Sequence, residues 1–148
     1  MTAHATSSLR AFDGGCHCGA IAFTFETAKP PDDWRVRACQ CSFCRRHGAR
    51  TTSDPDGRIR FRVRDASKVS RYRFAMRTVD FLVCATCGVY VAAVLDTPHG
   101  RFGTLNVNTI EPAIDVQDAV PMTYDDASEA DRTRRRQSQW TPVINATS

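Results

Sequence analysis

The chain has 148 residues, a length typical of one domain and sufficient to bury a hydrophobic core. No apolar run approaches the roughly 20 residues that span a bilayer, and the segment from Met1 to Arg10 lacks the apolar part of a secretory signal. A soluble, cytoplasmic protein without membrane contact is therefore expected. The formal net charge of +4 treats every cysteine as neutral.

The N-terminal part of the chain predicts short strands separated by loops. Residues 1–9 are small and polar and are expected to be flexible, which leaves 10–148 as a single domain. Residues 20–26 are rich in β-branched and aromatic side chains and predict a strand. A loop rich in proline and aspartate follows at 29–33, and 36–39 predicts a second strand.

A short helical turn is predicted at 42–47, with Ser42 as its N-cap and Gly48 as its stop. The segment 50–57 after it is polar and ends in the turn sequence Asp-Pro-Asp-Gly. A pocket shaped by this segment is expected to be open and polar.

Further strands and one helix are predicted in the rest of the chain. Residues 59–64 alternate apolar and arginine side chains with the period of two that a half-exposed strand requires. Acidic residues open the segment 125–137 and arginines close it, which suits a helix dipole, and its Arg134-Arg135-Arg136 run is interpreted as a solvated face. The sequence is therefore mainly β with a short C-terminal helix, and its remaining predicted strands are 69–74, 79–83, 89–95 and 102–107.

Seven cysteines fall in three short clusters. An odd number would leave one thiol over in a disulfide framework, and cysteines one residue apart rarely meet disulfide geometry. The spacings are instead typical of zinc ligands; a structural zinc site takes four ligands, whereas a reactive one takes three. The set therefore predicts one zinc ion of each kind, from Cys16-His17-Cys18, Cys39-Gln40-Cys41-Ser42-Phe43-Cys44 and Cys84-Ala85-Thr86-Cys87.

The two outer clusters form the predicted structural site. Each lies next to glycines that permit a tight turn, and each supplies two sulfurs. Together they close one tetrahedron that ties the N-terminal third of the chain to its middle, with the ligands Cys16, Cys18, Cys84 and Cys87.

The middle cluster of Cys39, Cys41 and Cys44 can surround a second zinc ion, with a fourth position open for a thiol, an aldehyde oxygen or water. His47 is the alternative fourth ligand, which would make the site structural, and it is also a candidate proton shuttle. With seven thiolates and two zinc ions the net charge falls from +4 to about +1. That small charge argues against nucleic acid as a partner.

These residues resemble the signature of the glutathione-dependent formaldehyde-activating enzyme family, also called the CENP-V/GFA domain family. The resemblance lies in the order, spacing and flanking glycines of 14–20, 39–46 and 84–88. It implies an Mss4-like fold of small twisted antiparallel sheets stapled by zinc. It also implies that the two outer clusters hold the structural ion and the middle cluster the reactive one.

The reaction that the resemblance implies joins glutathione, as co-substrate, to formaldehyde, formally a carbon–sulfur lyase working in reverse. Glutathione carries two carboxylates, and arginine binds a carboxylate with two parallel hydrogen bonds. Arg45 and Arg46, which follow Cys44 directly, are candidates for that contact. A solvated turn is the alternative interpretation of both.

A second class of function is open at this point: a zinc-stapled module without turnover that binds a protein or a nucleic acid. A homo-oligomer is also compatible with the sequence. A pure scaffold gains no obvious advantage from an incomplete ligand set, so the three-cysteine cluster favours an enzyme.

Overall fold

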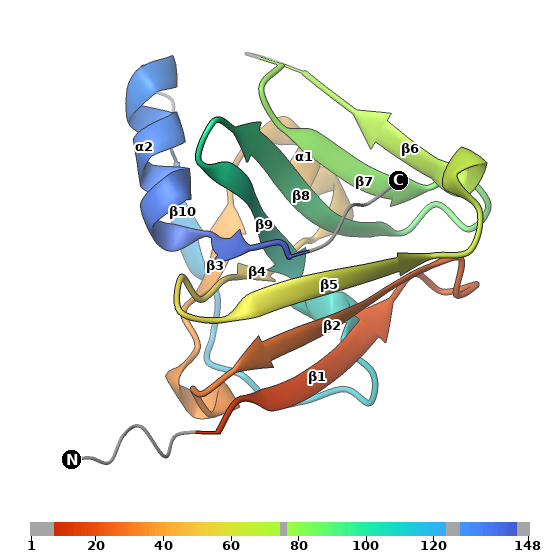
Figure 1. The fold of residues 1–148 in the computed structure, drawn as a ribbon, viewed down its shortest axis with the longest axis horizontal. Coiled ribbons are helices and arrows are strands. Elements are labelled where there is room, and N and C mark those ends of the chain that lie inside the picture. The colour runs from red at the N-terminus through yellow and green to blue at the C-terminus, as the bar shows by residue number, and fades with distance from the viewer. Residues whose placement is uncertain (1–7, 75–76, 124–127, 145–148) are drawn as a thin grey trace.

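The computed structural model describes residues 8–74, 77–123 and 128–144, which form two β-sheets around a shared hydrophobic core (Figure 1). The smaller sheet is antiparallel with the strand order β1-β2-β5. Apolar side chains alternate along β2, so Ile21, Phe23 and Phe25 point into the core, where each is at most 1% exposed. The three strands are β1 (Arg10–Gly15), β2 (Ile21–Thr27) and β5 (Arg58–Val63).

The larger sheet has eight strands, seven of them in the order β10-β3-β4-β9-β8-β7-β6, with β11 paired to β9. All of its pairs are antiparallel except β10 with β3, which are parallel. The expectation of antiparallel sheets therefore holds apart from this pair. The strands are β3 (Val36–Cys39), β4 (Thr51–Thr52), β6 (Val69–Tyr72), β7 (Asp80–Cys84), β8 (Tyr90–Thr97), β9 (Gly100–Asn106), β10 (Val120–Met122) and β11 (Thr141–Pro142).

The predicted strands are confirmed, with ends displaced by at most two residues. Four observed strands have no counterpart among the predictions. β4, β10 and β11 contain two or three residues, which is too short to show a period, and β1 includes an aspartate and two glycines that mask its pattern. The predicted flexible segment 1–9 falls outside the described residues except for its last two, both exposed.

The helix α1 (Ser42–His47) confirms the predicted turn and ends at Gly48, which has a left-handed φ of 58°. Its N-cap is Cys41 rather than Ser42, because the Cys41 sulfur accepts the N–H of Cys44. Short 3₁₀ helices lie at Pro31–Asp33, Ala66–Lys68 and Val107–Thr109.

The helix α2 (Glu129–Gln139) follows Ser128, whose hydroxyl accepts the N–H of Asp131 at 3.1 Å. The predicted start at 125 lies outside the described residues, and the helix ends two residues beyond the predicted 137. None of the described helices has the length and apolar character needed to cross a membrane.

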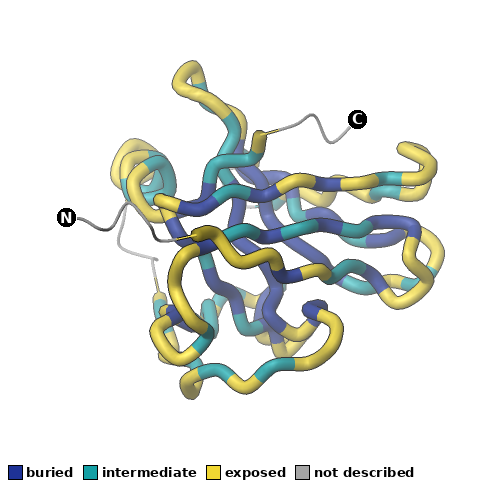
Figure 2. The backbone as a smooth tube through the Cα atoms, turned by 60° about the horizontal axis from the view of Figure 1, so that its bottom comes forward, coloured by how far each residue is buried: buried dark blue, intermediate teal, exposed yellow. Residues whose placement is uncertain are grey.

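The strand β8 is buried along most of its length. Figure 2 shows that the buried backbone gathers inside the molecule, with exposed turns around it. Val91 and Val94 belong to the core shared with the smaller sheet, whereas Ala93 and Leu95 pack with Trp140, the C-cap of α2. The tail of the chain is thereby fixed against the larger sheet. In Figure 1, α2 stands beside that sheet, next to β9.

Candidate metal centres and active site

Four cysteines meet where the β1–β2 and β7–β8 turns of the two sheets come together. Their Sγ atoms all lie within 4.8 Å of one another, with Cys16 to Cys18 at 3.7 Å and Cys18 to Cys84 at 3.5 Å. A tetrahedral zinc ion with Zn–S distances of about 2.3 Å separates its sulfurs by about 3.8 Å. The set of Cys16, Cys18, Cys84 and Cys87 could therefore hold a metal ion, and its geometry is consistent with zinc.

Backbone N–H groups donate hydrogen bonds to two of these sulfurs. The N–H of Ile21 donates to Cys16 Sγ at 3.3 Å, and the N–H groups of Thr86 and Cys87 donate to Cys84 Sγ, each at 3.4 Å. Desolvation raises the pKa of Cys84, but hydrogen bonds from these two N–H groups, joined by neighbouring thiols, lower it to about 6. A thiolate is the form that binds a metal ion.

The second cluster joins Cys39 at the end of β3, Cys41 at the N-cap of α1 and Cys44 within α1, with Sγ atoms again within 4.8 Å. The neighbouring thiols of Cys39 and Cys44 lower the pKa of Cys41, whereas the thiol of Cys41 raises the pKa of Cys39, and the thiols of Cys39 and Cys41, together with burial, raise that of Cys44. A bound cation would allow all three to ionise, so the cluster fits a metal site with three sulfur ligands.

His47 is not part of this cluster among the described residues. It lies exposed in the last turn of α1, with its ring 4.6 Å from the ring of Phe43 and 5.6 Å from that of Tyr90. The three sulfurs thus have no fourth protein ligand in the part of the chain that the structure describes.

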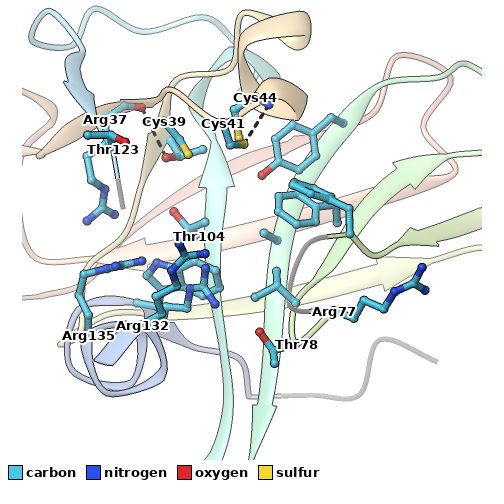
Figure 3. A pocket seen from close by; sticks show the side chains of 18 residues that line it. Arg37, Cys39, Cys41, Cys44, Arg77, Thr78, Thr104, Thr123, Arg132 and Arg135 are labelled. Atoms are coloured by element: carbon cyan, nitrogen blue, oxygen red, sulfur yellow. Dashed lines mark hydrogen bonds between the residues drawn. The ribbon is translucent and has the colours of Figure 1, made fainter. Parts of the chain in front are cut away.

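A pocket opens from the three sulfurs toward α2 (Figure 3). The cysteines lie at one end, Arg132 and Arg135 at the other, and Thr104 projects between them in this view. The pocket encloses about 930 Å³ when the open solvent at its mouth is included. Its remaining lining is mostly aromatic or cationic and comprises Phe74, Phe81, Tyr90, Trp140, Arg37, Arg77 and Arg136, with Thr51, Thr78, Val79, Ala93 and Thr123.

A family model described as glutathione-dependent formaldehyde-activating enzyme, GFA, matches residues 11–124, a span that contains all seven cysteines. The chain belongs to the GFA family. A crystal structure of a Rhodobacter sphaeroides protein, a Northeast Structural Genomics target, is also similar, with 34% sequence identity and a TM-score of 0.52. That similarity covers 74% of this chain and 97% of the other.

The GFA match ends before α2, so the arginines that α2 brings to the pocket lie outside it. Within the match, an aromatic cluster centred on Phe43 supports the pocket beside the three sulfurs, with ring distances of 4.8 Å to Phe81 and 5.0 Å to Tyr90. Tyr90 is 2% exposed, and its burial together with the nearby cysteines raises its pKa well above the ordinary value. Its hydroxyl therefore keeps its proton and can donate a hydrogen bond.

The two arginines after Cys44 do not line this pocket. Arg45 Nε donates to the Gln40 carbonyl and Arg46 Nη1 to the Ser42 carbonyl, each at 3.1 Å, and both side chains are exposed. These bonds hold the two guanidinium groups against the start of α1.

The arginine run near the C-terminus is solvated only in part. Arg134 is exposed and pairs with Asp131, whereas Arg135 and Arg136 are half-buried and line the pocket. The interpretation as a solvated face is thus wrong for two of the three. The sequence signal for this placement is the i, i+3, i+4 spacing of Arg132, Arg135 and Arg136, which puts the three side chains on one face of the helix.

The polar segment 50–57 also differs from its expected role. Thr51 and Thr52 form the buried strand β4, held between β3 and β9, and Thr51 is the segment's single contribution to the described pocket lining. The polarity of the pocket comes mainly from arginines instead.

Proposed function

We propose that this chain is a zinc-dependent enzyme of the carbon–sulfur lyase type that joins a glutathione-class thiol to formaldehyde or a related small aldehyde. The proposal places a structural zinc ion at Cys16, Cys18, Cys84 and Cys87 and a reactive one at Cys39, Cys41 and Cys44. It treats 10–148 as a single domain. Seven cysteines without disulfides suit a reducing compartment, and we place the protein in the cytoplasm on that ground.

The observation that carries the proposal is the difference between the two cysteine clusters. Four sulfurs gather away from the pocket in the number that a tetrahedral zinc site needs, whereas three lie at the inner end of the pocket without a fourth ligand among the described residues. A complete set is typical of structural zinc and an incomplete one of catalytic zinc. Membership of the GFA family supports the same division.

In the proposed reaction the thiol sulfur bonds to the aldehyde carbon. The π-electron pair of the carbonyl moves to oxygen, and the proton lost by the thiol ends on that oxygen, so atoms and charge balance in the hydroxymethyl thioether product. Zinc would supply positive charge that favours ionised sulfur at neutral pH.

The residues of the chain have separate tasks in this reaction. Tyr90 lines the pocket, and its hydroxyl can donate to the oxygen on which negative charge develops. The rings of Phe74 and Phe81 shield the reacting end from water. Since Tyr90 keeps its proton, we assign the stabilisation of this oxygen to it.

The test measures zinc content together with the rate of exchange between glutathione and its formaldehyde adduct, followed by NMR. We expect two zinc ions per chain and exchange faster than the uncatalysed background. The variant Cys41→Ser should lose one zinc ion and all of the acceleration while staying folded. Two zinc ions without any acceleration would reject the enzyme and leave a zinc-stapled binding module.

A further inference from the structure

The helix α2 turns arginine rather than apolar residues toward the larger sheet. Arg132, Arg135 and Arg136 are spaced i, i+3 and i+4, which places them on one helix face, and all three are half-buried in the pocket lining. Their neighbour Arg134 is exposed and pairs with Asp131 on the same helix. The sequence therefore separates pocket-facing from solvent-facing arginines within a single turn.

The end of α2 is anchored, so these guanidinium groups are held in place. Trp140 packs with Ala93 and Leu95 of β8 and with Val79, the residue before β7. Ser53 Oγ donates to the carbonyl of Gln139 at 2.8 Å.

The same serine joins β3 to this helix. Arg37 Nη2 donates to Ser53 Oγ at 2.5 Å, so Arg37 enters the pocket from β3 beside the anchored end of α2. Arg136 is partly committed to another contact, because its guanidinium lies 5.3 Å from the ring centre of Trp140. Arg37 of β3 and Arg132 and Arg135 of α2 line the same pocket.

Apart from the three sulfurs, the charge of the pocket has one sign among the described lining residues. Five arginines contribute to it, and no aspartate or glutamate appears in that part of the lining. A pocket lined by arginines concentrates anions. Guanidinium groups bind carboxylates with paired hydrogen bonds.

We propose that Arg132 and Arg135 of α2, with Arg37 of β3, bind a carboxylate of the thiol substrate and thereby select acidic thiols over neutral ones. The inference rests on the proposed function for the identity of the ligand as a thiol. The sulfur end of the substrate lies at the three cysteines, and the carboxylate end lies across the pocket at α2, as the positions of the labelled residues in Figure 3 allow. Specificity for the thiol thus comes from a helix outside the family match.

The experiment measures equilibrium binding by calorimetry with S-methylglutathione, which cannot add to an aldehyde, and with its diethyl ester. Arg135→Gln should weaken binding of the acid about 10-fold or more, the usual loss for a charged hydrogen bond, and leave binding of the ester within a factor of two. Arg132→Gln should act in the same direction, and Arg135→Lys should restore part of the loss. Arg134→Gln, one residue away on the solvent side, is the matched control and should change neither ligand.

Three results would overturn the inference: no binding of S-methylglutathione to the wild type, an equal effect of Arg134→Gln, or an equal loss for acid and ester. A failure of the proposed function looks different. Arginine-dependent binding of the acid without aldehyde turnover would retain the subsite and reject the reaction. Turnover of glutathione and its ester at equal efficiency would retain the reaction and reject the subsite.

Discussion

Replacing one cysteine in each cluster should have very different effects on stability. Cys84 is 1% exposed and ends β7, and its sulfur lies 3.5 Å from that of Cys18, so this contact links the two sheets. A structural zinc ion contributes on the order of 10 kcal/mol to folding. That figure is comparable with the entire stability of an ordinary domain, about 5–15 kcal/mol. Cys84→Ser should therefore leave the protein largely unfolded at 25 °C.

Cys41 occupies a more local position. Apart from its part in the pocket cluster, its sulfur caps α1 by accepting the N–H of Cys44 at 3.3 Å. Loss of an N-cap costs about 0.5–2 kcal/mol, and each kcal/mol lowers Tm by roughly 2–4 °C in a chain of this size. Cys41→Ser should therefore melt within about 10 °C of the wild type, with the hydroxyl of serine preserving part of the cap.

Circular dichroism melting with metal analysis of the same samples measures both effects. We expect one zinc ion in folded Cys41→Ser and loss of cooperative folding in Cys84→Ser. Equal destabilisation by the two substitutions would refute the division between a structural and a reactive cluster. A folded Cys84→Ser protein that retains two zinc ions would refute it as well.

Four further outcomes are expected. Tyr90→Phe should lower kcat with little change in KM, measured by exchange NMR, because the hydroxyl is assigned to the developing negative charge; a changed KM alone would contradict this role. Trp140→Ala should cost about 3–5 kcal/mol in urea unfolding and weaken S-methylglutathione binding, since it releases the end of α2; unchanged binding would show that α2 needs no such anchor. Gly88→Ala should cost about 1 kcal/mol in thermal unfolding, because its φ is 80°, and a neutral effect would indicate a relaxed turn. Asp96 accepts a hydrogen bond from Arg101, which lowers the folded-state pKa of Asp96, so its contribution to stability is present above its unfolded-state pKa and fades as the pH falls through the folded value. The substitution Asp96→Asn should therefore cost less than about 1 kcal/mol of stability at pH 7 and nothing at pH 2. A cost that persists in acid would exclude the charge as its cause.

The metal clusters could be predicted because their geometry is mostly local. Cysteines two or three residues apart approach one ion whenever the chain turns, and the adjoining glycines mark such turns. Strands with alternating or continuous apolar residues, such as β2 and β8, could also be predicted, since burial imposes that pattern on the sequence.

The far wall of the pocket could not be predicted, because it depends on contacts between distant segments. Arg37 and Arg135 lie 98 positions apart in the sequence and meet at one cavity through the packing of Trp140 and the bond from Ser53 to Gln139. Arginines on a helix predict a solvated face unless the segment that packs against that face is known. Conversely, Arg45 and Arg46 were candidates for the carboxylate contact because they follow Cys44, but their side chains are held against the start of α1.

The most direct test of the central claim is X-ray absorption at the zinc edge, combined with zinc content per chain. One site with four sulfurs and one with three predict two zinc ions with an average of about 3.5 sulfur ligands each. In Cys41→Ser the remaining zinc ion should have four. One zinc ion per wild-type chain, or a wild-type average of four sulfurs, would contradict the account.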